Sequence, residues 1–447
     1  MFHELVSRAT DLFTHMHPEL LSKLSFVVDS NWDRQVAWLQ SLVRFPSVRG
    51  NEESCQNWLA NEFATRDWRV DRYSLADVSI DSCPSYAPMI GVDPARSIQI
   101  VATIPPAADA SASKPNAGRS LILQGHVDVV PTGPEEMWTD PPFSGAVREN
   151  WLHGRGAQDM KMGISAMVFA LDAIRLAGLR LDAPVYVQVV TEEESTGNGA
   201  LSTLARGYKA DACLIPEPTG NTITRAQCGA LWFKLRLQSN PMHVESMPDE
   251  GNVILSALSL LASLRALTRR LNEAAARHTW FKDFPNPIKF SPGVIHGGDW
   301  ASSTPSWCEV DCRIGLLPGT PVKEMEQTVI DTVAEAAKAD PLLSENPPQI
   351  IWNGFRAEGA VLQPGSKAEE VLAQAHAAVF DAKMRSRLST AVNDTRYYAL
   401  YQNIPALCYG PTGEGLHGTN ERADLLNLKQ TTLVLAAFIA TWCGAYS

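Results

Sequence analysis

The stretch LILQGHVD, residues 121–128, is an apolar run that ends abruptly in polar side chains. A second apolar run, residues 185–190, is followed one residue later by three consecutive glutamates at 192–194. Residues 163–176 lie between the two runs and place their apolar side chains on one face of a predicted helix. Short apolar runs of this kind are typical of buried strands in a largely parallel sheet. The order strand, helix, strand therefore predicts an α/β fold with helices flanking the sheet.

Two later apolar runs also lead into polar residues. Residues 212–215 precede Glu217, and residues 406–409 precede a glycine-rich segment that contains His417. Open sheets of parallel strands bind ligands at the carboxyl ends of those strands. We therefore expect the polar residues that follow the four runs to form one site.

The pattern changes between residues 228 and 349. Strands and helices alternate here in an order that predicts a separate α+β domain inserted into the first one. The predicted elements are a strand at 231–237, a helix at 253–276, a strand that ends near Arg313 and a helix at 322–337. The first domain then comprises residues 1–227, of which 1–30 form a helical extension, and residues 350–447.

Composition excludes several kinds of protein. The chain is 45% hydrophobic and 19% charged, as is typical of soluble globular proteins. Its formal net charge of -11 argues against a nucleic-acid partner, because such proteins usually present a basic surface. No apolar stretch reaches the roughly 18 residues of a membrane-spanning helix, and residues 433–442 predict a buried C-terminal helix. We expect neither a nucleic-acid partner nor a membrane partner.

The N-terminus lacks the basic and then apolar pattern of a secretory signal, which favours a cytoplasmic location. The eight cysteines are scattered and form no CxxC pair. We expect them to be reduced and mostly buried.

His126 and Asp128 are two residues apart, so their side chains point to the same side if the strand continues. Imidazole is the commonest metal ligand, and a neighbouring carboxylate can fix its tautomer and orientation. His126 is therefore a candidate ligand and Asp128 its partner. The alternative is an exposed pair at a strand end.

Two acidic segments are further candidates. Asp159 lies in GRGAQDMK, residues 154–161, just before the predicted helix, where an N-cap is the alternative role. Glu192, Glu193 and Glu194 are adjacent like charges after a buried strand, which is costly unless a cation or protonation relieves it. One of them can bind metal while its neighbour handles protons. A run that faces solvent is the alternative.

Glu217 stands between two prolines that restrict it, and His417 lies in a glycine-rich loop. With His126, Asp159 and Glu194 they form a nitrogen and oxygen ligand set without cysteine. Such a set suits zinc and also accepts cobalt or manganese.

Five segments together resemble the zinc-dependent aminoacylase, acetylornithine deacetylase, succinyl-diaminopimelate desuccinylase and bacterial glutamate carboxypeptidase family. They occur in the family order and span nearly 300 residues. The segments are GHVDVVP at 125–131, GRGAQDMKMG at 154–163, TEEESTGNG at 191–199, PEPT at 216–219 and GLHGTNE at 415–421.

The resemblance implies two zinc ions per subunit that share Asp159. One ion is also held by His126 and Glu217, and the other by Glu194 and His417. Two such cations, roughly 3.5 to 4 Å apart, lower the pKa of a water that bridges them. They also stabilise the oxyanion that forms on the substrate.

The resemblance also implies that Glu193 is the general base, which takes a proton from that water and delivers it to the leaving amine. Glu192 then fills the acidic position that usually precedes the base. Three adjacent glutamates leave a shift of one residue open.

The inserted domain resembles the lid and dimerisation domain of the family. His243 matches a histidine that reaches the partner subunit's active site and binds the substrate carbonyl. Arg313, after the Gly297-Gly298 turn, matches a contact for the substrate carboxylate. Many family members have an asparagine near the position of Ser302 and Ser303. This sequence therefore differs from the family in a part of the inserted domain that recognises the substrate.

Arg396, in NDTR at 393–396, matches a segment that binds the same end of the substrate. Its planar guanidinium suits a carboxylate. A surface salt bridge to Asp394 is the alternative.

The sequence thus predicts a homodimeric amidohydrolase that cleaves the linear amide of a small N-acyl amino acid. Dipeptidase, carboxypeptidase or N-carbamoyl hydrolase activity is an alternative, because the same metal centre attacks any planar carbonyl. A non-catalytic dimeric binding protein is a further alternative, although every proposed ligand and the base are present.

Overall fold

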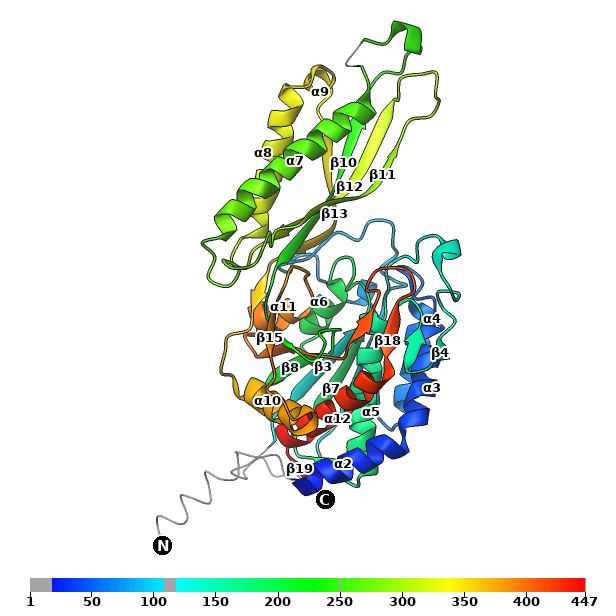
Figure 1. Cartoon of the computed structure of the whole chain (residues 1–447), viewed down its shortest axis with the longest axis vertical. Coiled ribbons are helices and arrows are strands. Elements are labelled where there is room, and N and C mark those ends of the chain that lie inside the picture. The colour runs from blue at the N-terminus through cyan, green and yellow to red at the C-terminus, as the bar shows by residue number, and fades with distance from the viewer. Residues whose placement is uncertain (1–17, 108–117, 249–250, 447) are drawn as a thin grey trace.

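The computed structural model describes residues 18–107, 118–248 and 251–446. Figure 1 shows a larger α/β domain with a smaller, elongated domain above it, which is built from the middle of the sequence. After the roles that the resemblance implies, they are called the catalytic body and the lid. Helix α2 (Pro18–Ser30) covers part of the predicted helical extension. The rest of that extension, residues 1–17, lies outside the described residues.

The catalytic body is centred on a six-stranded sheet with the order β1-β2-β7-β3-β8-β16. The last four strands of this order are parallel to one another, whereas β2 is antiparallel to both β1 and β7. This confirms the predicted mixed, largely parallel sheet. The strands are β1 (Arg69–Ser74), β2 (Ile98–Ile104), β3 (Leu121–His126), β7 (Val185–Val190), β8 (Ala212–Ile215) and β16 (Ala406–Cys408).

Helices flank this sheet. Helix α5 (Met162–Leu176) is buried on all sides rather than on one face, because it packs between β3 and helices α2, α3 and α12. Helix α12 (Leu425–Trp442) is long and apolar enough to cross a membrane, but 67% of it is buried inside the protein. The predicted buried C-terminal helix is confirmed. The other helices are α3 (Trp32–Val43), α4 (Glu53–Ala64), α6 (Asn198–Ala205), α10 (Lys367–Phe380) and α11 (Thr395–Tyr397).

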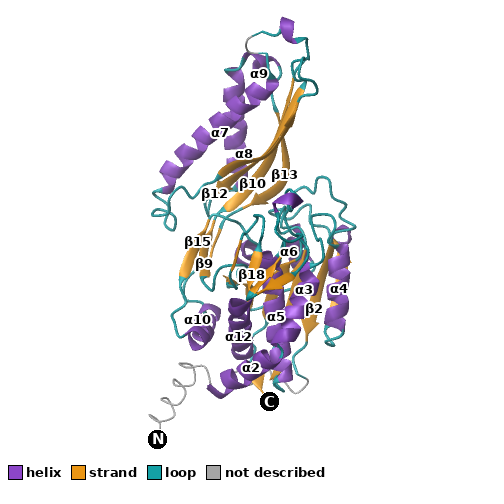
Figure 2. Ribbon diagram, turned by 45° about the vertical axis from the view of Figure 1, so that its right-hand side comes forward, coloured by secondary structure: helices purple, strands orange, loops and turns teal. Residues whose placement is uncertain are grey.

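The lid is an antiparallel sheet, in the order β11-β12-β10-β13, with helices on one face (Figure 2). Burial alternates along β10 because one face of the strand packs beneath the helices. Strand β13 pairs with β10, so the lid continues to Ala357, and the boundary predicted at residue 349 is wrong because it separates β13 from its sheet. The elements are β10 (Gly229–Gln238), β11 (Phe290–Gly297), β12 (Trp307–Leu316), β13 (Gln349–Ala357), α7 (Val253–Ala275), α8 (Val322–Lys338) and α9 (Pro341–Glu345).

Three small sheets and several single turns complete the described chain. The strands are β4 (Ala146–Arg148), β5 (Trp151–His153), β6 (Arg180–Leu181), β9 (Ile223–Gln227), β14 (Ala360–Val361), β15 (Ser386–Ser389), β17 (Gly413–Glu414), β18 (Arg422–Asp424) and β19 (Ala445–Tyr446). The turns are η1 (Leu75–Asp77), η2 (Glu135–Met137), η3 (Ala157–Lys161), η4 (Val244–Ser246) and η5 (Tyr398–Gln402). All eight cysteines are free, and all but Cys83 are buried, as predicted.

Candidate metal centre

The five predicted ligands meet at the carboxyl edge of the central sheet. His126 is the last residue of β3, and Glu194 and Glu217 follow the ends of β7 and β8. Asp159 lies in η3, directly before α5, and His417 lies in the loop between β17 and β18. Parallel strands end at the same edge of a sheet, which is why segments far apart in sequence meet here.

Asp159 lies between the two histidines. Its Oδ1 is 3.2 Å from Nε2 of His126, and its Oδ2 is 3.3 Å from Nε2 of His417. Oε1 of Glu194 is 3.2 Å from Nε2 of His417, and Oε1 of Glu217 is 3.9 Å from Nε2 of His126. The ligand atoms therefore form two groups that share Asp159, and in each group they lie within 4.8 Å of one another.

The site concentrates negative charge in a buried place. Burial raises the pKa of Glu193 and of Glu217 well above the usual value, and carboxylate neighbours add to the effect. Burial also opposes the charge of Asp159, but hydrogen bonds from His126 and His417 outweigh it and lower the pKa of that carboxyl. Divalent cations supply the positive charge that such a cluster lacks. The residues present fit a two-ion centre made of nitrogen and oxygen donors.

The three adjacent glutamates have different surroundings. Glu192 is fully buried, and its carboxylate accepts hydrogen bonds of 2.7 and 2.8 Å from Arg49 and one of 2.9 Å from Thr196. Because its oxygens are engaged, Glu192 is not available to a cation. Oε2 of Glu193 lies 3.8 Å from Nε2 of His126, while Glu194 contacts His417. The geometry agrees with Glu194 as the ligand and Glu193 as its neighbour, although Glu193 and Glu194 also lie close enough together with His126 to form a ligand group.

Asp128 orients the site in two ways. Nδ1 of His126 lies 2.9 Å from the backbone carbonyl oxygen of Asp128 and 3.6 Å from the carboxylate. The carboxylate itself accepts a 3.0 Å hydrogen bond from the backbone amide of Glu194. Asp128 therefore holds the His126 ring through its main chain and positions Glu194 through its side chain.

Glu421 was missed by the sequence reasoning although it ends one of the quoted segments. Its buried carboxylate accepts hydrogen bonds from the amides of Gly156, Gln158 and Asp159 at 3.0, 2.8 and 3.0 Å. Nη1 of Arg155 donates a further bond of 2.6 Å. Glu421 thus ties the segment that presents Asp159 to the loop that presents His417.

The metal-binding groups open into a cavity of about 130 Å³. Thr224, Arg387, Ser389 and Asn393 also line it. These residues come from β9, from β15 and from the segment after β15. The sequence reasoning connected the segment of Asn393 with the substrate but did not find Thr224, Arg387 or Ser389.

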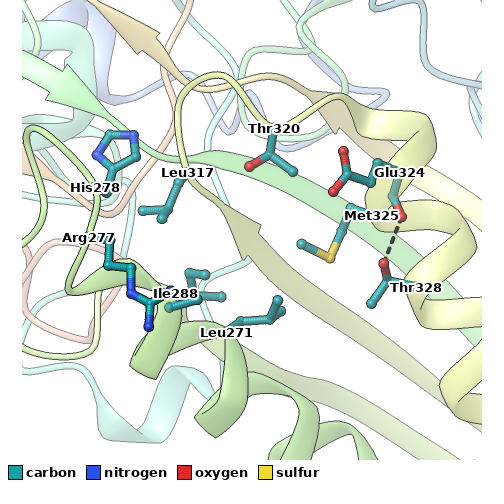
Figure 3. A pocket seen from close by; sticks show the side chains of 10 residues that line it. Leu271, Arg277, His278, Ile288, Leu317, Thr320, Glu324, Met325 and Thr328 are labelled. Carbon is teal, nitrogen blue, oxygen red and sulfur yellow. Dashed lines mark hydrogen bonds between the residues drawn. The ribbon is translucent and has the colours of Figure 1, made fainter.

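A larger cavity of about 320 Å³ lies in the lid, away from these groups (Figure 3). Leu271 and Ile288 contribute to its apolar lining, and His278 stands at one side. Both ring nitrogens of His278 are engaged, Nε2 with the carbonyl of Pro318 and Nδ1 with the amide of Trp280. The cavity in the lid therefore offers no free imidazole nitrogen. Glu193 and most of the candidate metal ligands line the smaller cavity instead.

His243 and Arg313 lie in the lid. His243 directly precedes η4, its side chain is 68% exposed, and it does not line the cavity of its own chain. A role across a dimer stays a prediction. Nη2 of Arg313 donates a 3.0 Å hydrogen bond to the carbonyl of Thr390, in the segment that lines the cavity. Its contact with a substrate carboxylate also stays a prediction.

Arg396 is completely buried, its guanidinium stacks 3.8 Å from the ring centre of Tyr397, and Nη2 donates to the carbonyl of Thr196 at 3.4 Å. Its Nε and Nη1 have no hydrogen-bond partner among the described residues, so a contact with the substrate stays a prediction. The alternative, a surface salt bridge to Asp394, does not fit the structure, because both residues are buried and Asp394 accepts its hydrogen bond from Gln124. Arg396 instead supports the loop that follows Glu194.

A mixed sheet whose carboxyl edge gathers two imidazoles and three glutamates around a shared aspartate is typical of a metal-dependent hydrolase. Comparison with known proteins agrees with this class. Residues 122–441 match the model of peptidase family M20/M25/M40, and the chain belongs to that family. It is a metal-dependent amidohydrolase.

Related proteins differ in what they act on. A succinyl-diaminopimelate desuccinylase from Methylorubrum extorquens is 30% identical over 429 residues, which cover 89% of this chain and 96% of the relative. An N-formyl-4-amino-5-aminomethyl-2-methylpyrimidine deformylase from Halalkalibacterium halodurans is 28% identical over 344 residues, 73% of this chain and 79% of the relative. The crystal structure of human carnosine dipeptidase 1 shares the fold, with a TM-score of 0.73 at 17% identity over 95% of this chain and 99% of that one.

Proposed function

We propose that this protein uses two zinc ions per subunit to hydrolyse the linear amide of a small N-acyl amino acid. The products are a carboxylic acid and a free amine. The observation that carries the proposal is the position of Asp159, whose two oxygens face His126 and His417 separately. His126 and Glu217 complete one ion site, and Glu194 and His417 the other. Cobalt or manganese suits the same donors.

Bound ions lower the pKa of water and stabilise negative charge on the substrate oxygen. Glu193 lies beside both ligand groups and is buried, so its carboxylate is placed to take the proton of the attacking water. Glu193 then delivers that proton to the leaving nitrogen, and the amide C–N bond breaks.

Substrate hydrolysis with and without chelator tests the proposal. The panel consists of N-acetyl, N-succinyl, N-formyl and N-carbamoyl amino acids together with dipeptides. We expect the N-acyl amino acids to be cleaved, cleavage to stop after chelation, and zinc to restore it. A folded protein that binds only trace divalent metal would contradict the two-ion proposal. Preferential cleavage of dipeptides would favour the dipeptidase alternative, which the likeness to a carnosine dipeptidase supports.

The partner we propose is a second copy of the chain, bound through the lid. Strand β11 is an edge strand that pairs only with β12, and nearly all of its residues are exposed. Val294 and Ile295 are 46% and 48% exposed, on opposite faces of the strand, and Leu255 on α7 is 57% exposed. An edge strand with apolar residues on both faces is costly to leave in water. We propose no nucleic-acid partner and no membrane partner. We propose that the protein is located in the cytoplasm.

Mixed dimers test whether His243 acts across that interface. Subunits with His243→Ala and subunits with Glu193→Gln are each expected to be inactive alone. In a one-to-one mixture after subunit exchange, half of the dimers are mixed and each has one complete site, so about one quarter of the wild-type activity should return. Sedimentation measures the dimer, and Ile295→Lys in both subunits should prevent both dimerisation and recovery. No recovery despite mixed dimers would contradict a contribution from the partner.

A further inference from the structure

Arg387 is the second residue of β15, a strand parallel to β9, where its register partner is Thr224. Both residues line the cavity that contains Glu194 and Glu217. Among the described residues that line this cavity, Arg387 is the only lysine or arginine. A positive charge therefore stands in the wall of a cavity whose other charged residues are the acids and His417 of the metal centre.

The guanidinium of Arg387 is free to bind a ligand. It is exposed, and it has no hydrogen bond or ion pair with any residue that the structure describes. Arg49 and Arg155 are already engaged, since Arg49 binds Glu192 and Arg155 binds Glu421. Arg396 has two nitrogens without a hydrogen-bond partner, but it is completely buried and does not line the cavity. Arg387 is thus a cation without a protein counter-ion beside a reaction centre.

The surrounding wall is polar and held in place from two sides. Oγ of Ser389 donates to the carbonyl of Ala391 at 3.1 Å, and Nδ2 of Asn393 donates to Sγ of Cys408 at 3.2 Å. Arg313 of the lid binds the carbonyl of Thr390 between them. The segment after β15 is therefore anchored both to the catalytic body and to the lid, which keeps this wall at a defined distance from the metal centre.

The geometry points to Arg387 as the residue that binds a carboxylate of the substrate. This inference rests on the proposed amide hydrolysis and adds the charge of the substrate to it. Two bound ions would balance the four acidic side chains of the centre, so a planar guanidinium in the wall adds positive charge and offers two parallel donors to a carboxylate.

The cavity has room for a small group beside Arg387. A volume of about 130 Å³ is close to that of an engineered cavity of about 150 Å³ that binds benzene. A short arm that carries a carboxylate fits this space. The arm is either the α-carboxylate side of the amino acid or the far end of a dicarboxylic acyl group such as succinyl, and both present the same chemistry to Arg387.

Matched substrates test the inference. Wild-type protein and Arg387→Gln are compared on an N-acetyl amino acid and its α-carboxamide, and on an N-succinyl amine and the corresponding N-succinamoyl amine. We expect Arg387→Gln to lower kcat/KM about 10- to 100-fold, mainly through KM, for the charged member of one pair and to leave its neutral member nearly unchanged. The pair that responds identifies which carboxylate is bound. Arg385→Gln, two residues away and outside the cavity, is the control and should match the wild type.

An equal response to charged and neutral substrates overturns the inference and leaves the amide hydrolysis intact. A wild-type protein that cleaves none of the substrates contradicts the proposed function instead. Calorimetric binding of N-acetylglutamate and of its diamide to zinc-loaded protein then decides the inference separately. Weaker binding of N-acetylglutamate alone in Arg387→Gln supports it, and unchanged binding overturns it.

Discussion

Glu193→Gln is expected to lower kcat by a factor of about 100 to 10,000 while the metal content stays unchanged, because general acid–base help typically contributes that much. Glutamine keeps the size of the side chain but cannot accept and return the proton. The carboxylate of Glu193 lies beside His126, whereas the His417 group is completed by Glu194. Loss of proton transfer without loss of the ions is therefore the expected signature.

Steady-state kinetics together with elemental analysis of the purified variant measure this effect. Glu194→Gln is the matched comparison, one residue away and chemically identical. It should lose metal as well as activity, since its carboxylate lies 3.2 Å from Nε2 of His417 and within 4.8 Å of a carboxylate oxygen of Asp159. If Glu194→Gln keeps its metal and loses activity while Glu193→Gln loses metal, the two roles are exchanged.

Asp159→Asn is expected to lower the affinity for both ions by more than about 100-fold and to reduce turnover to background. Removal of an outer partner of a metal ligand already costs about 10- to 100-fold, and Asp159 is the only residue shared by the two ligand groups among the described residues. The amide of asparagine offers one oxygen, so it cannot face both histidines with oxygen atoms as Asp159 does.

Competition titration with a zinc chelator gives the two affinities, and thermal unfolding of the chelated protein checks the fold. Asp283→Asn, at an exposed position of the lid, serves as control and should bind two ions as the wild type does. Two tightly bound ions in Asp159→Asn would contradict the shared role. Loss of a single ion would show that Asp159 serves only one of the two histidines.

Much of this architecture was evident from local sequence. Apolar runs such as residues 185–190 form buried strands. A strand that is buried on both faces needs apolar side chains throughout, and this pattern is visible in the run itself. His126 and Glu217 come at or just after the ends of two such runs. Their meeting at one edge then follows, because parallel strands end at the same edge of a sheet. The lid was recognisable for the same reason, since the alternation along β10 records one covered face.

Other assignments depended on contacts between segments far apart in the chain. Glu192 is excluded as a metal ligand only by its ion pair with Arg49, a residue 143 positions away in the chain. The burial of Arg396 and the exposure of Arg387 follow from how β15 and α11 pack, and both arginines look alike in sequence. Strand β13 joins the lid because its hydrogen bonds go to β10.

The sequence by itself therefore determined the strands, the helices and which residue types stand at the strand ends, because these depend on neighbours within a few residues. Tertiary structure alone decided which glutamate is neutralised by an arginine, which arginine is buried, and which residues line the cavity. Glu421 illustrates the difference: it is 262 residues from Asp159, yet it binds that residue's amide at 3.0 Å. Whether two charged groups interact depends on the distance between them in space, and the local sequence pattern does not indicate that distance.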